Sequence, residues 1–300
     1  MWAGLHAPMD WRDWQDRWPH AWHSRFVDLP EQHWHVQVSG QGPVLLLLHG
    51  TGASTHSWRD LIPVLEPHCT VVRPDLPGHA FSPLHAGHPP SLGHIATSLC
   101  HLLDRLGLWP AAIAGHSAGA AVAARLMLDQ PDRPVPLLIG LNPAWLPLHG
   151  LAAWLFPPSA RLLALNPLAA RLIAAQAART QLVRRLIEMT GSHLDAAGLE
   201  GYQRLLQSAA HVQGVLSMMA AWNLDDLEVR LGQIRGAVRI HLGGADRTIP
   251  GHLVRDALVR MPQAQVLRVP GLGHLAHEEQ PVETATTLLR WLAETRHPGG

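Results

Sequence analysis

The chain has 300 residues, enough for one large domain with an insertion. Its 23 basic side chains balance its 23 acidic ones, so it has no basic excess and we expect no nucleic-acid partner. Only 15% of the residues are charged, against about 25% in an average soluble protein. This low charge predicts an apolar surface that suits a small apolar ligand or a membrane neighbour.

Cysteine usage and targeting signals narrow the compartment. Cys69 and Cys100 are the only two cysteines, too few for a disulfide framework, which favours a reducing compartment. The first residues lack a basic stretch followed by an apolar one, and no apolar run reaches the roughly 18 residues of a membrane-spanning helix. We therefore expect a cytoplasmic protein, with peripheral membrane contact as the alternative.

Residues 1–24 form a Trp-rich arm. Trp11, Trp14, Trp18 and Trp22 are spaced by three, four and four residues, which predicts a helix with all four rings on one face. We favour an arm packed on the domain. The alternative is an amphipathic helix lying at a membrane interface, where Trp is enriched.

From Arg25 onwards, strand patterns alternate with helix patterns. FVDL and WHVQV predict a hairpin, and VLLLLHG at Val44–Gly50 is typical of a strand buried on both faces of a parallel sheet. Further buried strands are predicted at Thr70–Asp75, Ala111–Ser117, Pro136–Asn142, Val238–Gly244 and Ala264–Pro270. Helices are predicted at Ser57–Glu66, Ser91–Leu106 and Val282–Glu294. The alternation predicts an α/β fold with a mostly parallel, eight-stranded type of sheet covered by helices on both faces.

One long stretch, residues 143–231, carries no strand pattern. It is rich in Ala, Leu and Arg and is punctuated by prolines. We expect an all-helical cap here, inserted into a core made of residues 25–142 and 232–300.

Ser117 is the predicted nucleophile. It is the centre of Gly115-His116-Ser117-Ala118-Gly119, a G-x-S-x-G motif between a buried strand and the helix pattern AAVAARLML. In this context the serine sits on a sharp strand-to-helix turn above the sheet edge, and its small neighbours permit the turn. A serine hydroxyl needs a general base to become nucleophilic.

The base and its acid partner are predicted in loops that follow later strands. His274, in GLGHLAH after the last strand, is the predicted base, and His277 is the less favoured alternative. Asp246, in GADRTIP after the preceding strand, would orient the imidazole and stabilise its charged form. Asp225 and Asp226 are rival acids, but they lie in what reads as the last helix of the insertion.

Acyl transfer also needs donors for an oxyanion. We predict the N–H groups of Thr51 and Ala118 in this role, and removal of one such donor typically costs about 10²–10³ in rate. Gly50 and Gly52 flank Thr51 and would let the backbone approach the substrate closely. With His116, they are predicted substrate contacts.

These motifs resemble a known superfamily. HGTG, DLPGH at Asp75–His79, GHSAG, GADRTIP and GLGHLAHEEQP look like the landmarks of α/β-hydrolases, in the same order over nearly the whole chain. The resemblance implies an α/β-hydrolase fold in which the insertion is the cap domain. Ala80 departs from the pattern, because DLPGHG usually has glycine there; the change affects the loop backbone and not the triad.

A closer resemblance extends into the cap. The segments LLLLHGTGASTHSWRDL, DLPGHAFS, GHSAGAAVAARL, LLALNPL and RRLIEMTGS are similar to the magnesium-chelatase accessory proteins of bacteriochlorophyll biosynthesis in photosynthetic bacteria. This resemblance implies a role near insertion of Mg²⁺ into protoporphyrin IX, with chelatase subunits as partners and the photosynthetic membrane as a peripheral neighbour. It does not supply a reaction.

The cap composition is compatible with a protoporphyrin-like ligand. Met218, Met219 and Trp222 would form an apolar wall, and cap arginines would pair with propionates. These arginines are Arg161, Arg171, Arg179, Arg184 and Arg185. The alternative, which we favour, is that these residues pack and solvate the cap itself. No histidine pair has convincing metal-ligand spacing, so we predict no metal and no cofactor.

Three functions stay open at this point. The first is an accessory protein with a serine-hydrolase site for an ester or thioester. The second is a non-catalytic porphyrin-binding or chelatase-partner protein on a hydrolase scaffold. The third is a general carboxylesterase unrelated to tetrapyrroles. Dehalogenases and epoxide hydrolases use aspartate where this chain has Ser117. Perhydrolases, C–C hydrolases and hydroxynitrile lyases share the Ser/His/Asp set.

Overall fold

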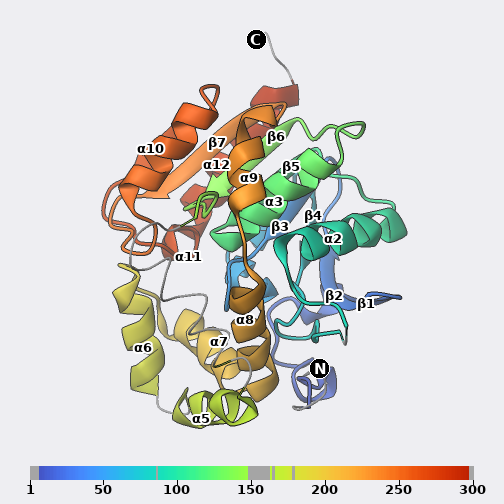
Figure 1. Cartoon of the computed structure of the whole chain (residues 1–300), viewed down its shortest axis with the longest axis vertical. Coiled ribbons are helices and arrows are strands. Elements are labelled where there is room, and N and C mark those ends of the chain that lie inside the picture. The colour runs from blue at the N-terminus through green and yellow to red at the C-terminus, as the bar shows by residue number, and fades with distance from the viewer. Residues whose placement is uncertain (1–6, 86, 148–162, 164–165, 178–179, 297–300) are drawn as a thin grey trace.

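The computed structural model describes residues 7–85, 87–147, 163, 166–177 and 180–296 (Figure 1). One sheet with strand order β1-β2-β4-β3-β5-β6-β7-β8 forms its centre. The strands are β1 Ser24–Leu29, β2 Gln32–Ser39, β3 Val44–Leu48, β4 Thr70–Pro74, β5 Ala112–His116, β6 Leu137–Leu141, β7 Ala237–Gly243 and β8 Gln265–Val269. The predicted α/β-hydrolase sheet and its strands are confirmed.

Strand direction determines where functional loops meet. β1 pairs with β2 as an antiparallel hairpin, and β2 is antiparallel to β4. From β4 to β8 every neighbouring pair is parallel. The loops that follow β3, β5, β6, β7 and β8 therefore leave the same edge of the sheet, where ligand sites of open α/β folds assemble.

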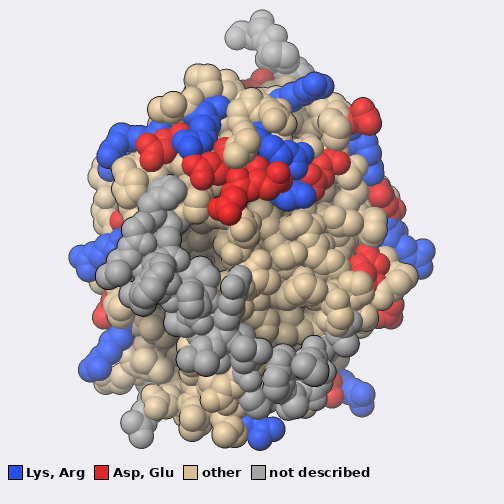
Figure 2. Space-filling model, in the orientation of Figure 1, with Lys and Arg blue, Asp and Glu red and all other residues tan. Residues whose placement is uncertain are grey.

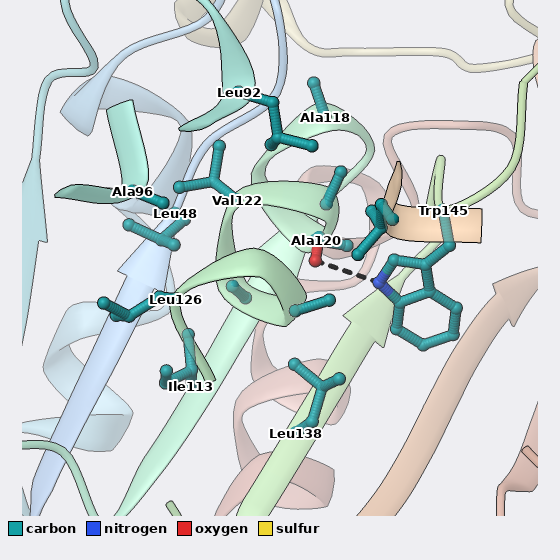
Figure 3. Packing of buried hydrophobic residues seen from close by; sticks show 14 of the residues in the cluster. Leu48, Leu92, Ala96, Ile113, Ala118, Ala120, Val122, Leu126, Leu138 and Trp145 are labelled. Atoms are coloured by element: carbon teal, nitrogen blue, oxygen red, sulfur yellow. Dashed lines mark hydrogen bonds between the residues drawn. The ribbon is translucent and has the colours of Figure 1, made fainter. Parts of the chain in front are cut away.

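The apolar run of β3 explains how the helices are layered. Leu46 and Leu48 belong to a core cluster shared with α2, α3, α9 and α10, whereas Leu45 and Leu47 belong to a second cluster shared with α1 and α12. Successive strand side chains point to opposite faces, so both faces of this strand are buried. Figure 3 shows α3 packed on the first face, with the Trp145 indole donating to the Ala120 carbonyl oxygen at 2.9 Å.

The helices fill the segments between strands. Those of the core are α1 Ile62–Leu65, α2 Leu92–Leu106, α3 Ala118–Asp129, α10 Gly251–Arg260, α11 Ala276–Glu279 and α12 Pro281–Arg296. The helix predicted over Ser57–Glu66 is instead a 3₁₀ turn, η3 at Thr55–Trp58, followed by the short α1. None of the helices in the described ranges is long and apolar enough to cross a bilayer.

The described part of the insertion is helical. Its helices are α5 Pro167–Ala177, α6 Thr180–Met189, α7 Ala196–Leu206, α8 Ala209–Ala221 and α9 Asp225–Arg230. In Figure 1, α5, α6, α7 and α8 lie below the sheet, whereas α9 lies beside α3. The boundary of the cap at residues 143–231 stays a prediction.

Ion pairs fasten α9 to the core. The Asp226 carboxylate lies 3.1 Å from Arg125 on α3 and 3.2 Å from Arg230, and Arg230 also pairs with Asp129 on α3 at 3.0 Å. Figure 2 shows a belt of acidic and basic side chains across one face of the molecule. Asp226 is therefore engaged in surface ion pairs, which accounts for this rival acid without a catalytic role.

The Trp-rich arm is not one helix, and this prediction was wrong. Two 3₁₀ turns, Trp11–Asp13 and Ala21–His23, are separated by Pro19 and by His20 at φ 55°. A proline disfavours helical geometry in the residue before it, and a left-handed residue reverses the chain. As a result Trp22 is 78% exposed, whereas Trp18 is only 4% exposed.

The arm nevertheless packs on the domain. Trp18 shares a cluster with Ala80 and Phe81 of the core and Leu205 of α7, and Trp11 and Trp14 pack against the same cluster. The Trp18 indole N–H donates to Thr55 Oγ1 at 3.0 Å. The arm thus contacts both the core and a cap helix.

Candidate active site

Ser117 stands on a strained turn between β5 and α3. Its backbone has φ 50° and ψ −116°, a conformation that L-residues rarely adopt. Its N–H donates to the Leu141 carbonyl oxygen at 3.0 Å, and its own carbonyl oxygen accepts from the Ala144 N–H at 3.1 Å. These bonds to the neighbouring strand end hold the turn, as the G-x-S-x-G motif predicts.

The two flanking glycines are required by close backbone contacts. A Cβ at Gly115 would lie 2.5 Å from the Ala120 nitrogen, and one at Gly119 would lie 2.2 Å from the Leu48 carbonyl oxygen. Ala118 is the first residue of α3. The first N–H groups of a helix have no partner within the helix, so the Ala118 N–H is available to an oxyanion.

The acid and base predicted from sequence are hydrogen-bonded to each other. His274 Nδ1 lies 2.9 Å from Asp246 Oδ2, and both side chains are nearly buried. Asp246 Oδ1 accepts from the backbone N–H groups of Thr248 at 2.6 Å and Ile249 at 3.1 Å. Burial alone would raise the pKa of Asp246, but the hydrogen bonds from His274, Asn142 and Thr248 outweigh it and hold the pKa below its usual value.

Asn142 is a site residue that the sequence reasoning missed. Its Nδ2 donates to Asp246 Oδ2 at 2.7 Å, so this oxygen is bonded by both Asn142 and His274. Its Oδ1 accepts from the Gly243 N–H at 3.3 Å, and its φ of 45° is left-handed. The available signal was a polar residue that directly ends the apolar strand PLLIGL.

His116, predicted as a substrate contact, lies beneath the base. Its Nε2 bonds the His274 carbonyl oxygen at 2.9 Å, and burial lowers its pKa to about 3. Its ring centroid is 4.7 Å from that of His274 and 4.5 Å from that of His277. His277 is buried against Trp58, and it is His274 that contacts Asp246.

The cap also holds the loop of the base. The His274 N–H donates to the Thr190 carbonyl oxygen at 3.3 Å, and the Leu275 N–H donates to Ser192 Oγ at 2.7 Å. Among the described residues no hydrogen bond joins the Ser117 hydroxyl to His274. In serine hydrolases this bond often tightens only when substrate is present.

The loop after β3 lies directly against the nucleophile. A Cβ at Gly50 would lie 3.2 Å from Ser117 Cβ and 2.6 Å from His116 Nδ1, so only glycine fits. The Gly50 carbonyl oxygen bonds His49 Nδ1 at 2.8 Å and the Ala53 N–H at 3.1 Å. In a trans peptide the next N–H points the opposite way, so these two bonds orient the Thr51 N–H.

The predicted cap contacts have different surroundings. Met218 on α8 is buried, and its sulfur lies 4.0 Å from Thr51 Oγ1. Met219 and Trp222 are half-buried, and Trp222 packs against the larger core cluster. Arg171, Arg184 and Arg185 are exposed. Arg161 and Arg179 lie outside the described residues.

The described ranges hold no group of three or more His, Cys, Asp or Glu side chains arranged to bind a metal ion. Cys69 and Cys100 are both buried free thiols.

Comparison with known proteins agrees with the geometry. Residues 45–287 match the alpha/beta hydrolase family. This chain belongs to that family. Over 261 residues it is 42% identical to the magnesium-chelatase 30 kDa subunit of Rhodobacter capsulatus, covering 86% of this chain and 90% of that protein.

Solved structures of the family share the fold. An alpha/beta hydrolase fold protein from Burkholderia ambifaria superposes with a TM-score of 0.75 at 25% identity, over 95% of this chain and 99% of that one. A thermophilic esterase from Thermogutta terrifontis gives a TM-score of 0.70 at 20% identity, over 91% of this chain and 99% of that one.

Proposed function

We propose that this hydrolase-family chain is an accessory protein of bacteriochlorophyll biosynthesis at the magnesium-chelatase step and that it hydrolyses an ester or thioester under its cap. The pathway is supported by the 42% identity to a protein named as a chelatase subunit. The chemistry is supported by one observation above all: His274, Asp246 and Asn142 are hydrogen-bonded in series beside a serine on a strained turn.

The proposed reaction begins with attack of Ser117 Oγ on the carbonyl carbon. His274 Nε2 takes the hydroxyl proton, and Asp246 stabilises the imidazolium that forms. The N–H groups of Ala118 and Thr51 stabilise the oxyanion. Collapse of the tetrahedral intermediate breaks the bond to the leaving alcohol or thiol, which receives the proton from His274. A water molecule, deprotonated by His274, then releases the acyl group and restores Ser117.

The second candidate is a non-catalytic chelatase partner that binds a protoporphyrin-like tetrapyrrole. The Rhodobacter capsulatus relative is named as a chelatase subunit and not as a hydrolase, which favours this candidate. Both candidates share the scaffold, and they differ in whether Ser117 is needed.

Two measurements separate them. Purified protein is assayed with p-nitrophenyl acetate and with butyryl-coenzyme A, and Ser117→Ala is expected to abolish turnover while Ser217→Ala on α8 retains it. In cells, Ser117→Ala is expected to lower bacteriochlorophyll and to accumulate protoporphyrin IX. Normal pigment in the Ser117→Ala strain, with a folded and expressed protein, would reject the catalytic proposal in favour of the partner role.

A further inference from the structure

The loop at residues 75–82 lies between the oxyanion loop and the cap. Its His79 Nε2 accepts a hydrogen bond from the Gly52 N–H at 3.1 Å. The next residue, Ala80, donates its N–H to Nδ1 of His211 on α8 at 3.1 Å. Two successive residues therefore bond the oxyanion loop on one side and a cap helix on the other.

Backbone contact keeps α8 against this loop. A Cβ on Gly214 of α8 would lie 1.8 Å from the Gly78 carbonyl oxygen, and one on Gly78 would lie 2.8 Å from Gly214 Cα. Neither position accepts a side chain, so the helix and the loop approach at the minimum distance. A movement of α8 toward the loop at this point must displace the loop.

Both imidazoles must be neutral to accept these bonds. Each uses a ring nitrogen as the acceptor for a backbone N–H, and a protonated nitrogen cannot accept. His79 Nδ1 donates to the Pro77 carbonyl oxygen at 3.2 Å, so the neutral ring carries its proton on Nδ1. Burial lowers the pKa of His79 well below its usual value and that of His211 to about 4, and His49 acts in the same direction. The backbone groups of Pro77 on His79 and of Gly52 on His211 oppose the shift, as does Asp75.

The bonds act on backbone with positive φ next to the predicted oxyanion donor. Gly52 has φ 82°, and the peptide that follows Thr51 is oriented by the Gly52 N–H bond to His79. Ala80 has φ 43°, in the left-handed region that favours glycine. The bond from Ala80 to His211 offsets that strain, which explains how alanine is held at this position.

We propose that His79 and His211 are positioning residues through which cap helix α8 sets the orientation of the Thr51–Gly52 segment of the oxyanion hole. This inference rests on the proposed hydrolase function for its effect on rate. Its structural part, the connection from α8 to Gly52, is independent of that function.

Matched amide substitutions test each acceptor. Glutamine places an acceptor near the position of Nε2, whereas asparagine places one near Nδ1. His79→Gln and His211→Asn therefore keep the acceptor, and His79→Asn and His211→Gln displace it. With p-nitrophenyl acetate as substrate, His79→Asn and His211→Gln are each expected to lower kcat about 10- to 100-fold and to change KM less than about threefold. This loss of rate is smaller than the loss expected when an oxyanion donor is removed completely. His79→Gln and His211→Asn are expected to retain most of the wild-type kcat.

Amide hydrogen exchange supplies a readout that needs no turnover. Exchange of residues 50–53 is expected to accelerate in His211→Gln and to stay near the wild-type rate in His211→Asn, at equal melting temperature. Equal effects of both substitutions on kcat and exchange, or no effect of either, would overturn the positioning role. If exchange accelerates in His211→Gln but the wild-type protein hydrolyses neither p-nitrophenyl acetate nor butyryl-coenzyme A and the Ser117→Ala strain keeps normal pigment, only the proposed function is rejected and the connection from α8 to Gly52 stands.

Discussion

The two halves of the candidate site are attached to the cap in different ways. The acid–base half consists of Asp246, His274 and Asn142, which follow β7, β8 and β6 and bond one another at 2.7–2.9 Å. The oxyanion half is the loop after β3, in which the Gly52 N–H donates to His79. The residue after His79, Ala80, donates its N–H to His211 of the cap.

The two halves therefore depend on the cap in different ways. Loops at one edge of a parallel sheet bring the acid–base side chains together, and the cap bonds the backbone of these loops at the N–H groups of Arg247, His274 and Leu275. The oxyanion half is attached to α8 through the side chains of His79 and His211, so a displacement of α8 is expected to reach it.

The largest expected effect is on the acid–base half. Asp246→Asn leaves the volume unchanged but removes the charge and the acceptor that orients His274, and kcat is expected to fall by about 10⁴. The assay is ester hydrolysis at saturating substrate. Asp225→Asn, at an exposed position of α9, is the matched control and should retain activity. Equal activity of the two variants would assign the acid elsewhere.

The next effect is on stability and concerns the packing of the arm against Ala80 and Phe81, the segment that follows His79. Trp18→Ala removes a buried indole that packs on Ala80 and Phe81, which is expected to cost about 3–5 kcal/mol of unfolding free energy. Trp22→Ala, at a 78% exposed ring, should change stability by less than about 0.5 kcal/mol. Urea unfolding measures both. Similar losses in the two variants would contradict the packing described for the arm.

Asn142→Ala removes one of the two side-chain donors to Asp246. A hydrogen bond to a charged group is worth about 1.5–3 kcal/mol, so kcat/KM is expected to fall roughly 10- to 100-fold. The pKa of Asp246 should rise, because one of the hydrogen bonds that lower it is lost. Asn223→Ala, whose side chain bonds Asp225, is the control and should leave kcat/KM unchanged.

Buried neutral histidines make the fold sensitive to acid. Burial lowers the pKa of His241 on β7 from 6.5 to about 4, so between these values the unfolded chain binds a proton that the folded chain does not. Stability therefore falls as pH drops below 6.5 and this loss levels off near pH 4, on the order of 2 kcal/mol by pH 5. His241→Leu should remove that share of the loss in melts between pH 7.5 and 5. An unchanged pH dependence would show that His241 titrates normally.

Much of the fold could be predicted because the signals are local. The alternation of Leu45 and Leu47 with Leu46 and Leu48 across the two core clusters is visible as an unbroken apolar run. The turn around Ser117 is encoded by two glycines that sterics require. Chain order then led to His274 and Asp246, which are hydrogen-bonded as expected.

What could not be predicted depends on contacts between distant segments. Helical spacing of the arm tryptophans is overridden by Pro19 and the left-handed His20. In the sequence, Asn142 is only the polar residue that ends a strand. Its contact with Asp246 exists because the loop after β7 lies beside it in the folded chain. His79 and His211 are 132 positions apart in the chain and meet only because α8 packs on the Gly78 backbone.

Covalent capture tests whether Ser117 is an activated nucleophile. Folded protein is incubated with a fluorophosphonate at neutral pH, and the modified residue is located by mass spectrometry of peptides. We expect stoichiometric phosphonylation of Ser117, slowed severely in Asp246→Asn and absent in Ser117→Ala. An unmodified Ser117 in folded wild-type protein, or equal labelling of the Ser117→Ala variant, would contradict it.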